Sequence, residues 1–74
     1  MLEFLRGILA SKLSVEPQKI DIDAPIFETG ISSLAHLNAI MEIEEKLNIE
    51  LDGAELKMFY EGTIAQIADM LIKQ

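Results

Sequence analysis

Apolar residues recur at helical spacing in separate segments of the chain, and this periodicity constrains the fold more than any other feature of the sequence. In residues 2–13 and again in residues 64–72, Leu, Ile or Ala return every three or four positions, so that they share one face of a helix. Half of all residues (50%) are apolar, mostly Leu, Ile, Ala and Met, and only 5% are aromatic, which favours helix over strand. We therefore expect an all-α fold.

The first two helices have recognisable ends. The first should stop near Ser14, because Pro17 disfavours helical geometry in the residue before it and cannot donate a helical hydrogen bond. The second should begin at Ser32 or Ser33, where a serine hydroxyl can accept a hydrogen bond from a first-turn amide. It should run to about Asn48.

Two capping boxes predict two further helices. The pairs with this spacing are Asp52 with Glu55 and Thr63 with Gln66. They indicate a short third helix at about 54–60 and a fourth at 64–72. Gly62 is suited to the left-handed position that often ends a helix, so we expect it to terminate the third.

The connection at residues 15–31 is long and irregular, with Pro17, Pro25 and Gly30 as interruptions. Connections of this length inside a small domain are uncommon unless they serve a function. It also contains too many apolar residues for a solvated linker, and we expect several of them to pin an ordered loop across the helices. These residues are Val15, Ile20, Ile22, Ile26, Phe27 and Ile31.

A chain of 74 residues forms one domain, here residues 1–74, and leaves little room for a deep catalytic cleft. Without cysteine it has neither disulfides nor a thiolate metal site, so apolar packing alone must hold it together. We expect a small antiparallel four-helix bundle in which the first, second and fourth helices supply most of the core. The third should cross one end.

The net charge of −7 repels nucleic acid and the anionic surface of a membrane. No stretch is long and apolar enough to span a bilayer, and Met1 leads into an amphipathic segment without a signal-peptide pattern. We expect a cytoplasmic monomer that does not bind nucleic acid and does not insert into membranes. The same charge should attract partner proteins with basic docking patches.

The most informative stretch is residues 27–34, Phe-Glu-Thr-Gly-Ile-Ser-Ser-Leu. It resembles the attachment motif of acyl and peptidyl carrier proteins, in which a Gly-apolar-Asp-Ser-Leu run precedes the second helix and its serine carries a phosphopantetheine arm. Ser33 matches that serine. The resemblance covers nearly the whole chain, from the helix-Pro-loop opening through Asp23, Phe27 and Gly30 to two short closing helices. It implies a bundle of the acyl-carrier type, with 4′-phosphopantetheine from coenzyme A as the cofactor.

Ser32 departs from the family motif, which usually has aspartate at this position. Serine can still cap the helix, but the negative charge is lost. In the family that aspartate belongs to the surface read by the transferase that installs the arm, so the departure bears on which transferase modifies Ser33. A phosphodiester on Ser33 would lie beside free amides and the positive end of the helix dipole. The alternative to an attachment site is that the serine pair serves only as a helix cap.

The second helix carries two apolar rows. One row consists of Ala39, Ile40, Ile43 and Leu47, and the other, which we expect to face outward, consists of Leu34, Leu37 and Met41. With Ser32 and the carboxylates of Glu42, Glu44 and Glu45, the outward row would form a docking surface for partner proteins. Glutamates on a helix are more often a solvated face, and it is the carrier resemblance that favours docking. Ala35 and Asn38 are uncharged where the family is usually acidic.

The resemblance also implies what the protein carries and which proteins it meets. Acyl, aminoacyl or peptidyl groups would be held as thioesters, in fatty-acid, polyketide, nonribosomal-peptide or related specialised metabolism. Partners would include a phosphopantetheinyl transferase, an acyl- or aminoacyl-loading ligase, and downstream synthases, transferases or modifying enzymes. In many fatty-acyl carriers the cargo folds between the second and third helices. The candidate lining here is Ala39, Ile43, Ala54, Phe59 and Ile64.

Other functions compete with the carrier hypothesis. A small acidic helical adaptor could bind partners through the second helix and never carry a group. A hydrolase built on Ser33 and His36 is disfavoured, because the Gly-x-Ser-x-Gly nucleophile elbow is absent around Ser33 and no orienting acid is evident. We expect His36 to be an exposed helix residue and the protein not to be an enzyme. Asp21 and Asp23 fail as a calcium loop, since Pro25 takes the place of the third ligand. No metal site is predicted, and these aspartates are solvated or cap nearby amides.

Overall fold

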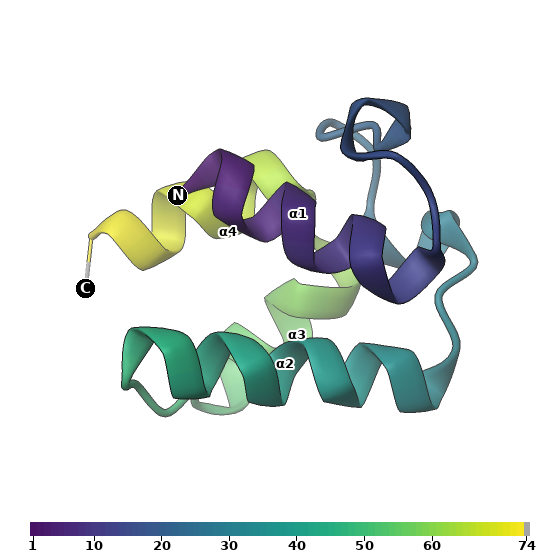
Figure 1. Ribbon diagram of the computed structural model, residues 1–74. Helices are drawn as coiled ribbons and strands as arrows, with labels where there is room; N and C mark the ends of the chain where they lie inside the picture. The colour runs from purple at the N-terminus through teal and green to yellow at the C-terminus, as the bar shows by residue number, and fades with distance from the viewer. Residues whose placement is uncertain (74) are drawn as a thin grey trace.

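The computed structural model describes residues 1–73, and over these residues the chain forms α-helices and short 3₁₀ helices without a β-strand (Figure 1). In chain order the elements are α1 (Leu2–Leu13), η1 (Pro17–Lys19), η2 (Ile26–Thr29), α2 (Ser33–Leu47), α3 (Gly53–Glu61) and α4 (Ile64–Ile72). The predicted all-α bundle with a long first loop and a short third helix is confirmed. None of the described helices is long and apolar enough to cross a membrane.

Left-handed residues end the two longer helices. Ser14 (φ 58°) follows α1 and Asn48 (φ 55°) follows α2. In each case the next amides turn back to late carbonyls of the helix; Val15 N–H donates to Ala10 O at 3.0 Å and Ile49 N–H to Glu44 O at 3.1 Å. The predicted ends near residues 14 and 48 are therefore confirmed, and these backbone turns supply a local reason for them.

Both predicted capping boxes are present. Asp52 accepts from the amide of Glu55 at 2.8 Å, while the Glu55 carboxylate accepts from the amide of Asp52 at 2.9 Å. Thr63 and Gln66 make the equivalent pair of bonds at 3.1 and 2.9 Å. Each box satisfies two amides that a helix leaves unpaired, so these short helices begin where the sequence predicted.

Gly62 ends α3 for a different reason from the one expected. Its backbone is extended (φ −89°, ψ 172°) and not left-handed, so the prediction of a left-handed glycine was wrong. A Cβ atom at this position would lie 2.7 Å from the Met58 carbonyl oxygen and would also meet the Met58 sulfur. Close approach to the preceding turn, and not backbone conformation, is what requires glycine here.

Buried residues and backbone bonds hold the long loop in place. Ile20 and Ile26 are buried, Ile22 and Ile31 pack partly against the core, and Val15 and Phe27 are exposed. Ile26 N–H donates to Gly62 O at 3.0 Å, and Ala65 N–H donates to Ile22 O at 3.1 Å. The loop is therefore ordered, as expected, and it is tied to the junction between α3 and α4.

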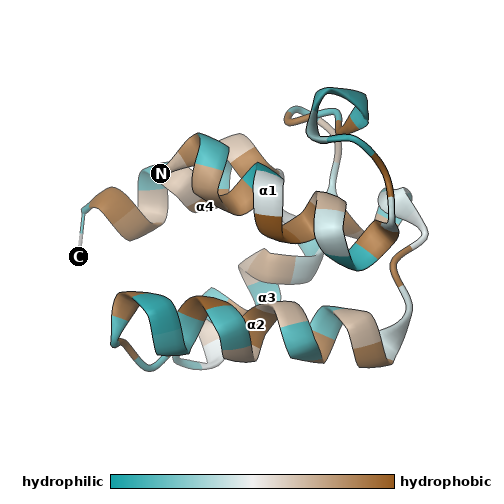
Figure 2. Ribbon diagram, in the orientation of Figure 1, coloured by the Kyte–Doolittle hydropathy of each residue, from teal (hydrophilic) through white to brown (hydrophobic). Residues whose placement is uncertain are grey.

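The core is shared mainly by α1, α2 and α4. Its fully buried side chains include Leu5 and Leu9 of α1, Ile43 of α2, and Ile64 and Ile67 of α4. α1 and α2 pack together and run in opposite directions, while α3 lies behind them and packs on η2 and α4 (Figures 1 and 2). Phe59 is the buried residue that α3 adds among those described.

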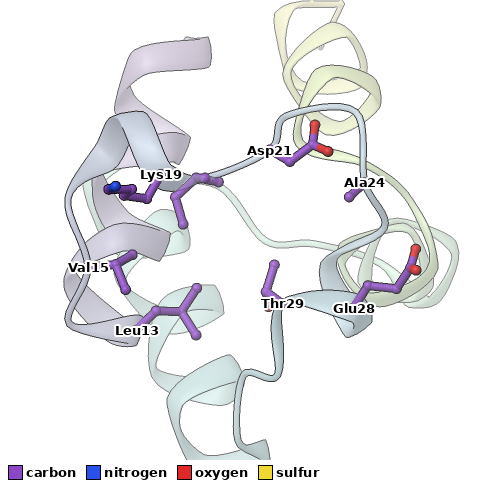
Figure 3. A pocket seen from close by; sticks show the side chains of 8 residues that line it. Leu13, Val15, Lys19, Asp21, Ala24, Glu28 and Thr29 are labelled. Carbon is purple, nitrogen blue, oxygen red and sulfur yellow. The ribbon is translucent and has the colours of Figure 1, made fainter.

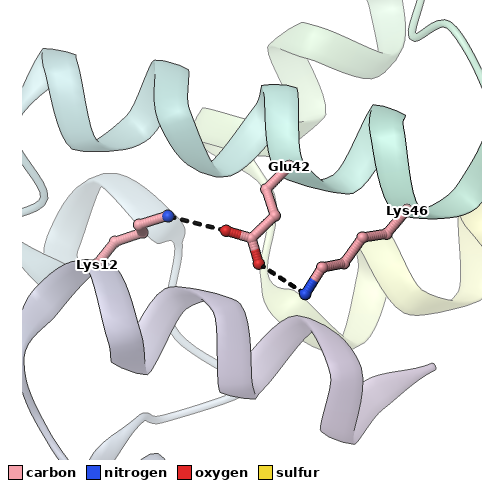
Figure 4. Close-up of polar contacts among 3 residues, drawn as sticks. All are labelled: Lys12, Glu42 and Lys46. Atoms are coloured by element: carbon pink, nitrogen blue, oxygen red, sulfur yellow. Dashed lines mark hydrogen bonds and ion pairs between the residues drawn. The ribbon is translucent and has the colours of Figure 1, made fainter.

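A three-residue charge cluster joins α1 to the middle of α2 (Figure 4). The Glu42 carboxylate accepts from Lys12 Nζ at 2.8 Å and pairs with Lys46 Nζ at 3.2 Å. The hydrogen bonds from Lys12 and then Lys46 hold the pKa of Glu42 below its ordinary value. Glu42 was expected to edge the outward docking surface, and this was wrong because its side chain turns toward α1 and is neutralised there.

Candidate functional site

Ser33 is the first residue of α2, and Ser32 is the residue that caps the helix. Ser32 Oγ accepts a hydrogen bond from the Ala35 amide at 3.1 Å. Ser33 is exposed, and within the described part of the chain its hydroxyl makes no hydrogen bond. The capping task and the free hydroxyl are thus divided between the two serines, and the sequence alone left this division open.

The turn before Ser33 is built by its own backbone and by Thr29. Thr29 Oγ1 donates to Ile26 O at 2.6 Å and accepts from the Ile31 amide at 3.3 Å. Gly30 then adopts a left-handed conformation (φ 78°), which L side chains adopt only with strain. These contacts fix the direction in which the chain enters α2 and so fix the position of Ser33.

The start of α2 fits a phosphorylated adduct of serine. The first-turn amides of a helix have no intrahelical acceptor, and the helix dipole favours negative charge at this end. Ser32 uses only the Ala35 amide, and no acidic residue lies in the first turn of α2. A phosphodiester on Ser33 would therefore meet free donors and no competing carboxylate in that turn.

The outward apolar row of α2 is exposed as predicted. Leu34 is 69%, Leu37 is 52% and Met41 is 56% exposed, whereas Ala39, Ile40 and Ile43 are buried. We call Leu34, Leu37 and Met41 the α2 ridge. It begins one residue after Ser33, so a protein that bound the ridge would have the serine within its footprint.

The two other carboxylates predicted beside the α2 ridge, those of Glu44 and Glu45, differ in whether they make a hydrogen bond. Glu44 Oε2 accepts a hydrogen bond from the Leu51 amide at 2.9 Å, so this side chain also braces the segment before α3. Glu45 is exposed. Of the acidic residues expected beside the α2 ridge, Glu45 is therefore the one that is exposed and whose side chain makes no hydrogen bond or ion pair within residues 1–73.

The structure separates one candidate cargo residue from the other four. Ala39, Ile43, Phe59 and Ile64 belong to one buried core cluster. Ala54 is exposed and lines a surface hollow beside α3 together with residues such as Lys57 and Gln66. A cargo lining made of all five residues stays a prediction, and it would require the buried four to make room.

His36 is not the exposed residue that was expected. Its Nε2 atom lies 3.0 Å from the carbonyl oxygen of Phe59, and its ring meets the ring of Tyr60 edge-on at 5.5 Å. Tyr60 in turn contacts Phe27 of η2, with ring centroids 5.7 Å apart. The expectation was wrong because α3, which is distant in sequence, folds back over the first turn of α2. No local sequence pattern indicated this cluster, because its three residues lie on η2, α2 and α3.

A second hollow lies between the end of α1 and the long loop (Figure 3). Its volume is about 310 Å³, and Leu13, Val15 and Thr29 are among its lining residues. The carboxylates of Asp21 and Glu28 point away from its centre. None of the predicted cargo residues lines it. It was not predicted from the sequence, because it forms only where the long loop folds over the end of α1.

Asp21 acts as a local cap in the loop. Its Oδ1 atom accepts a hydrogen bond from the Asp23 amide at 2.9 Å, which is the amide-capping role that the sequence suggested for these aspartates. Within residues 1–73 no group of three His, Cys, Asp or Glu side chains is placed to hold a metal ion.

Comparison with known proteins places the chain in a family. The family model described as "Phosphopantetheine attachment site" matches residues 3–71. An acyl carrier protein of Campylobacter hominis is 37% identical over 54 residues, which make up 72% of this chain and 68% of that protein. An acyl carrier protein of Campylobacter concisus is 33% identical over 54 residues, or 72% of this chain and 70% of that protein. An acyl carrier protein of Cyanophora paradoxa is 30% identical over 70 residues, or 93% of this chain and 66% of that protein.

These matches agree with the attachment motif, the helical bundle and the free serine at the start of α2. They also make 4′-phosphopantetheine the cofactor of this protein. The chain belongs to the family of carrier proteins that bear a phosphopantetheine attachment site.

Proposed function

We propose that Ser33 carries the phosphopantetheine arm and that the protein presents acyl, aminoacyl or peptidyl thioesters to partner enzymes. The observation that carries this proposal is the exposed Ser33 hydroxyl, free of hydrogen bonds within the described chain and placed at the start of α2. Attachment forms a phosphodiester between Ser33 Oγ and the pantetheine phosphate of coenzyme A. It breaks the pyrophosphate bond and releases adenosine bisphosphate and the hydroxyl proton.

The chain itself positions the arm at the start of α2, and the arm supplies the reactive thiol when bound. The chain has no cysteine, so a thioester carrier of this sequence depends on a thiol from the cofactor. Ser32 leaves Ser33 free by taking over the capping bond, and the uncharged first turn accommodates the phosphate. No catalytic role is assigned to the chain, because its proposed task is to hold a group that partner enzymes transform.

Partner enzymes would bind beside Ser33 through the α2 ridge. Leu34, Leu37 and Met41 offer exposed apolar contact, and Glu45 offers a charge at the far end. Since Ser32 is uncharged, the transferase that modifies Ser33 should depend more on apolar contact than on a basic patch. Ligases, synthases and modifying enzymes would use the same face.

The same surface supports a narrower proposal for the metabolic pathway that the protein serves. The uncharged residues Ser32, Ala35 and Asn38 weaken the acidic pattern around Ser33. We infer a dedicated discrete carrier in specialised metabolism, in preference to a general fatty-acid carrier. The candidate cargo lining of Ala39, Ile43, Ala54, Phe59 and Ile64 further predicts that a medium-chain acyl group stabilises the loaded protein.

Intact-protein mass spectrometry tests the attachment. The protein is incubated with coenzyme A and a broad-specificity phosphopantetheinyl transferase, and Ser33→Ala and Ser32→Ala are treated alongside. We expect one phosphopantetheine on the wild type and on Ser32→Ala and none on Ser33→Ala. If several transferases add nothing to a folded wild type, the α2 ridge belongs instead to an adaptor that binds partners without carrying a group.

A further inference from the structure

We use the word seam for the boundary along which α2 faces α3 and the segment before it. Hydrogen bonds hold this seam at two places. At one end, Glu44 of α2 accepts from the Leu51 amide, just before α3 begins. At the other end, His36 of α2 reaches the Phe59 carbonyl in the last turns of α3. Between these ties the backbone of α3 makes more close contacts with η2 and α4 than with α2. Among the described residues, these two side-chain hydrogen bonds join α2 to α3 and to the segment before it.

The His36 contact has a defined chemical direction. A carbonyl oxygen only accepts hydrogen bonds, so His36 Nε2 must carry the proton and donate to Phe59 O across 3.0 Å. Phe59 O is also in need of a donor. The amide four residues later, that of Thr63, donates to Gln66 Oε1 and so is not available to it. His36 thus supplies a capping bond that α3 does not make for itself.

The ring of Tyr60 strengthens this end of the seam. It lies between His36, at 5.5 Å, and Phe27 of η2, at 5.7 Å. Aromatic pairs at such distances contribute beyond the area they bury. The last turn of α3 therefore contacts α2 through His36 and η2 through Phe27.

Phe59 links the contacts of His36 to the buried core. Its side chain is fully buried in the same core cluster as Ala39 and Ile43 of α2, while its carbonyl is the group that His36 holds. Because cores are packed without spare volume, an acyl group that entered between α2 and α3 would have to displace buried side chains, and Phe59 is the buried side chain that α3 contributes. A displacement that moved the backbone of α3 at Phe59 would also break the bond from His36.

We propose that His36 is a positioning residue that keeps α3 closed on α2 and thereby limits which acyl groups the protein encloses. This inference rests on the proposed attachment of cargo at Ser33. In the unloaded form the His36–Phe59 bond stabilises the protein. In a form whose cargo has entered the seam the bond is already broken, so the imidazole no longer contributes.

The test is a thermodynamic cycle on the full chain. Wild type and His36→Ala are loaded with phosphopantetheine (the pantetheine form) or with octanoyl-phosphopantetheine (the octanoyl form) by a broad-specificity transferase from the matching coenzyme A, and Tm is measured for all four forms. We expect His36→Ala to lower Tm of the pantetheine form by about 4–8 °C, the effect of one ordinary hydrogen bond in a domain of this size. Tm of the octanoyl form should hardly change, so octanoylation should stabilise the variant more than the wild type.

Two further variants of His36 distinguish the effect of its hydrogen bond from the effect of its side-chain volume. His36→Gln keeps a hydrogen-bond donor and should behave like the wild type. His36→Leu keeps apolar contact with Tyr60 but donates no hydrogen bond, so it should behave like His36→Ala. It replaces His36→Ala in the test if the alanine variant does not fold. Asn38→Ala, at an exposed position on the same helix with no side-chain hydrogen bond in the described chain, should shift Tm of both loaded forms by the same amount, because a gain in helix propensity does not depend on the cargo. Equal lowering of both loaded forms by His36→Ala, or lowering of neither, would overturn the proposal.

The same samples distinguish this proposal from the one on which it depends. Mass spectrometry of each sample before the Tm measurement reports whether Ser33 carries the group. A wild type that takes up neither group refutes the attachment, and the cargo-limiting role of His36 fails with it. A fully loaded set whose Tm differences are independent of His36 refutes the positioning role alone and leaves the carrier function intact.

Discussion

The two halves of α2 are held in different ways. The first half, from Ser33 to Met41, carries no acidic or basic residue apart from His36 and exposes the α2 ridge. The second half is charged and anchored, because Glu42 joins Lys12 of α1 and Glu44 braces the segment before α3. The ion pair to α1 therefore lies in the second half of α2, whereas the first half, which begins at the proposed attachment residue Ser33, carries no carboxylate or ammonium group. Changes in the two halves should separate stability from docking.

The largest difference should come from neighbouring apolar residues on opposite faces of α2. Ile43→Ala removes a fully buried side chain and should lower the free energy of unfolding by about 2–5 kcal/mol, through lost apolar burial and the cavity left behind. Met41→Ala, on the exposed α2 ridge, should change it by no more than about 0.5 kcal/mol. Urea unfolding followed by circular dichroism measures both. A large cost for Met41→Ala would mean that the ridge is covered in the folded protein.

The serine pair should show a smaller contrast of the same kind. Ser32→Ala removes the cap of α2 and should cost about 1 kcal/mol of unfolding free energy while leaving Ser33 open to modification. Ser33→Ala should stay within about 0.5 kcal/mol of wild type, because its hydroxyl makes no hydrogen bond in the described chain. Thermal unfolding of both variants checks this. The assignment of the two roles is wrong if Ser33→Ala proves to be the costlier change.

The smallest effect should come from the charged half. Glu42→Gln should lower the free energy of unfolding by roughly 0.5–1 kcal/mol at neutral pH, and less in high salt, since the ion pairs with Lys12 and Lys46 are partly exposed. The pKa of Glu42 is lowered in the folded protein, so its stabilising effect is complete above the ordinary pKa of 4.5 and is lost as pH falls through the lowered value. The gap between wild type and Glu42→Gln should therefore close on acidification below pH 4.5. A gap that persists unchanged in acid would point to packing instead of charge.

The sequence by itself determined the features that depend on near neighbours. Caps such as Ser32 and Asp52 bond amides only three residues away, so their pattern is visible in the sequence and the helix starts followed from it. The two apolar rows of α2 were separable for a similar reason, because helical geometry alone decides which residues share a face. The family and its cofactor followed from the motif at residues 27–34 together with a resemblance that covers nearly the whole chain.

The tertiary structure decided the features whose partners are distant in the chain. Glu42 turns toward Lys12, 30 positions away, and His36 bonds Phe59, 23 positions away, so neither side chain could be oriented from its own helix. Gly62 is required by the close approach of Met58, which depends on how the chain leaves α3. Local hydrogen bonds are set by spacing along the chain, whereas these contacts exist only after the helices have packed, because packing is what brings their two partners within reach.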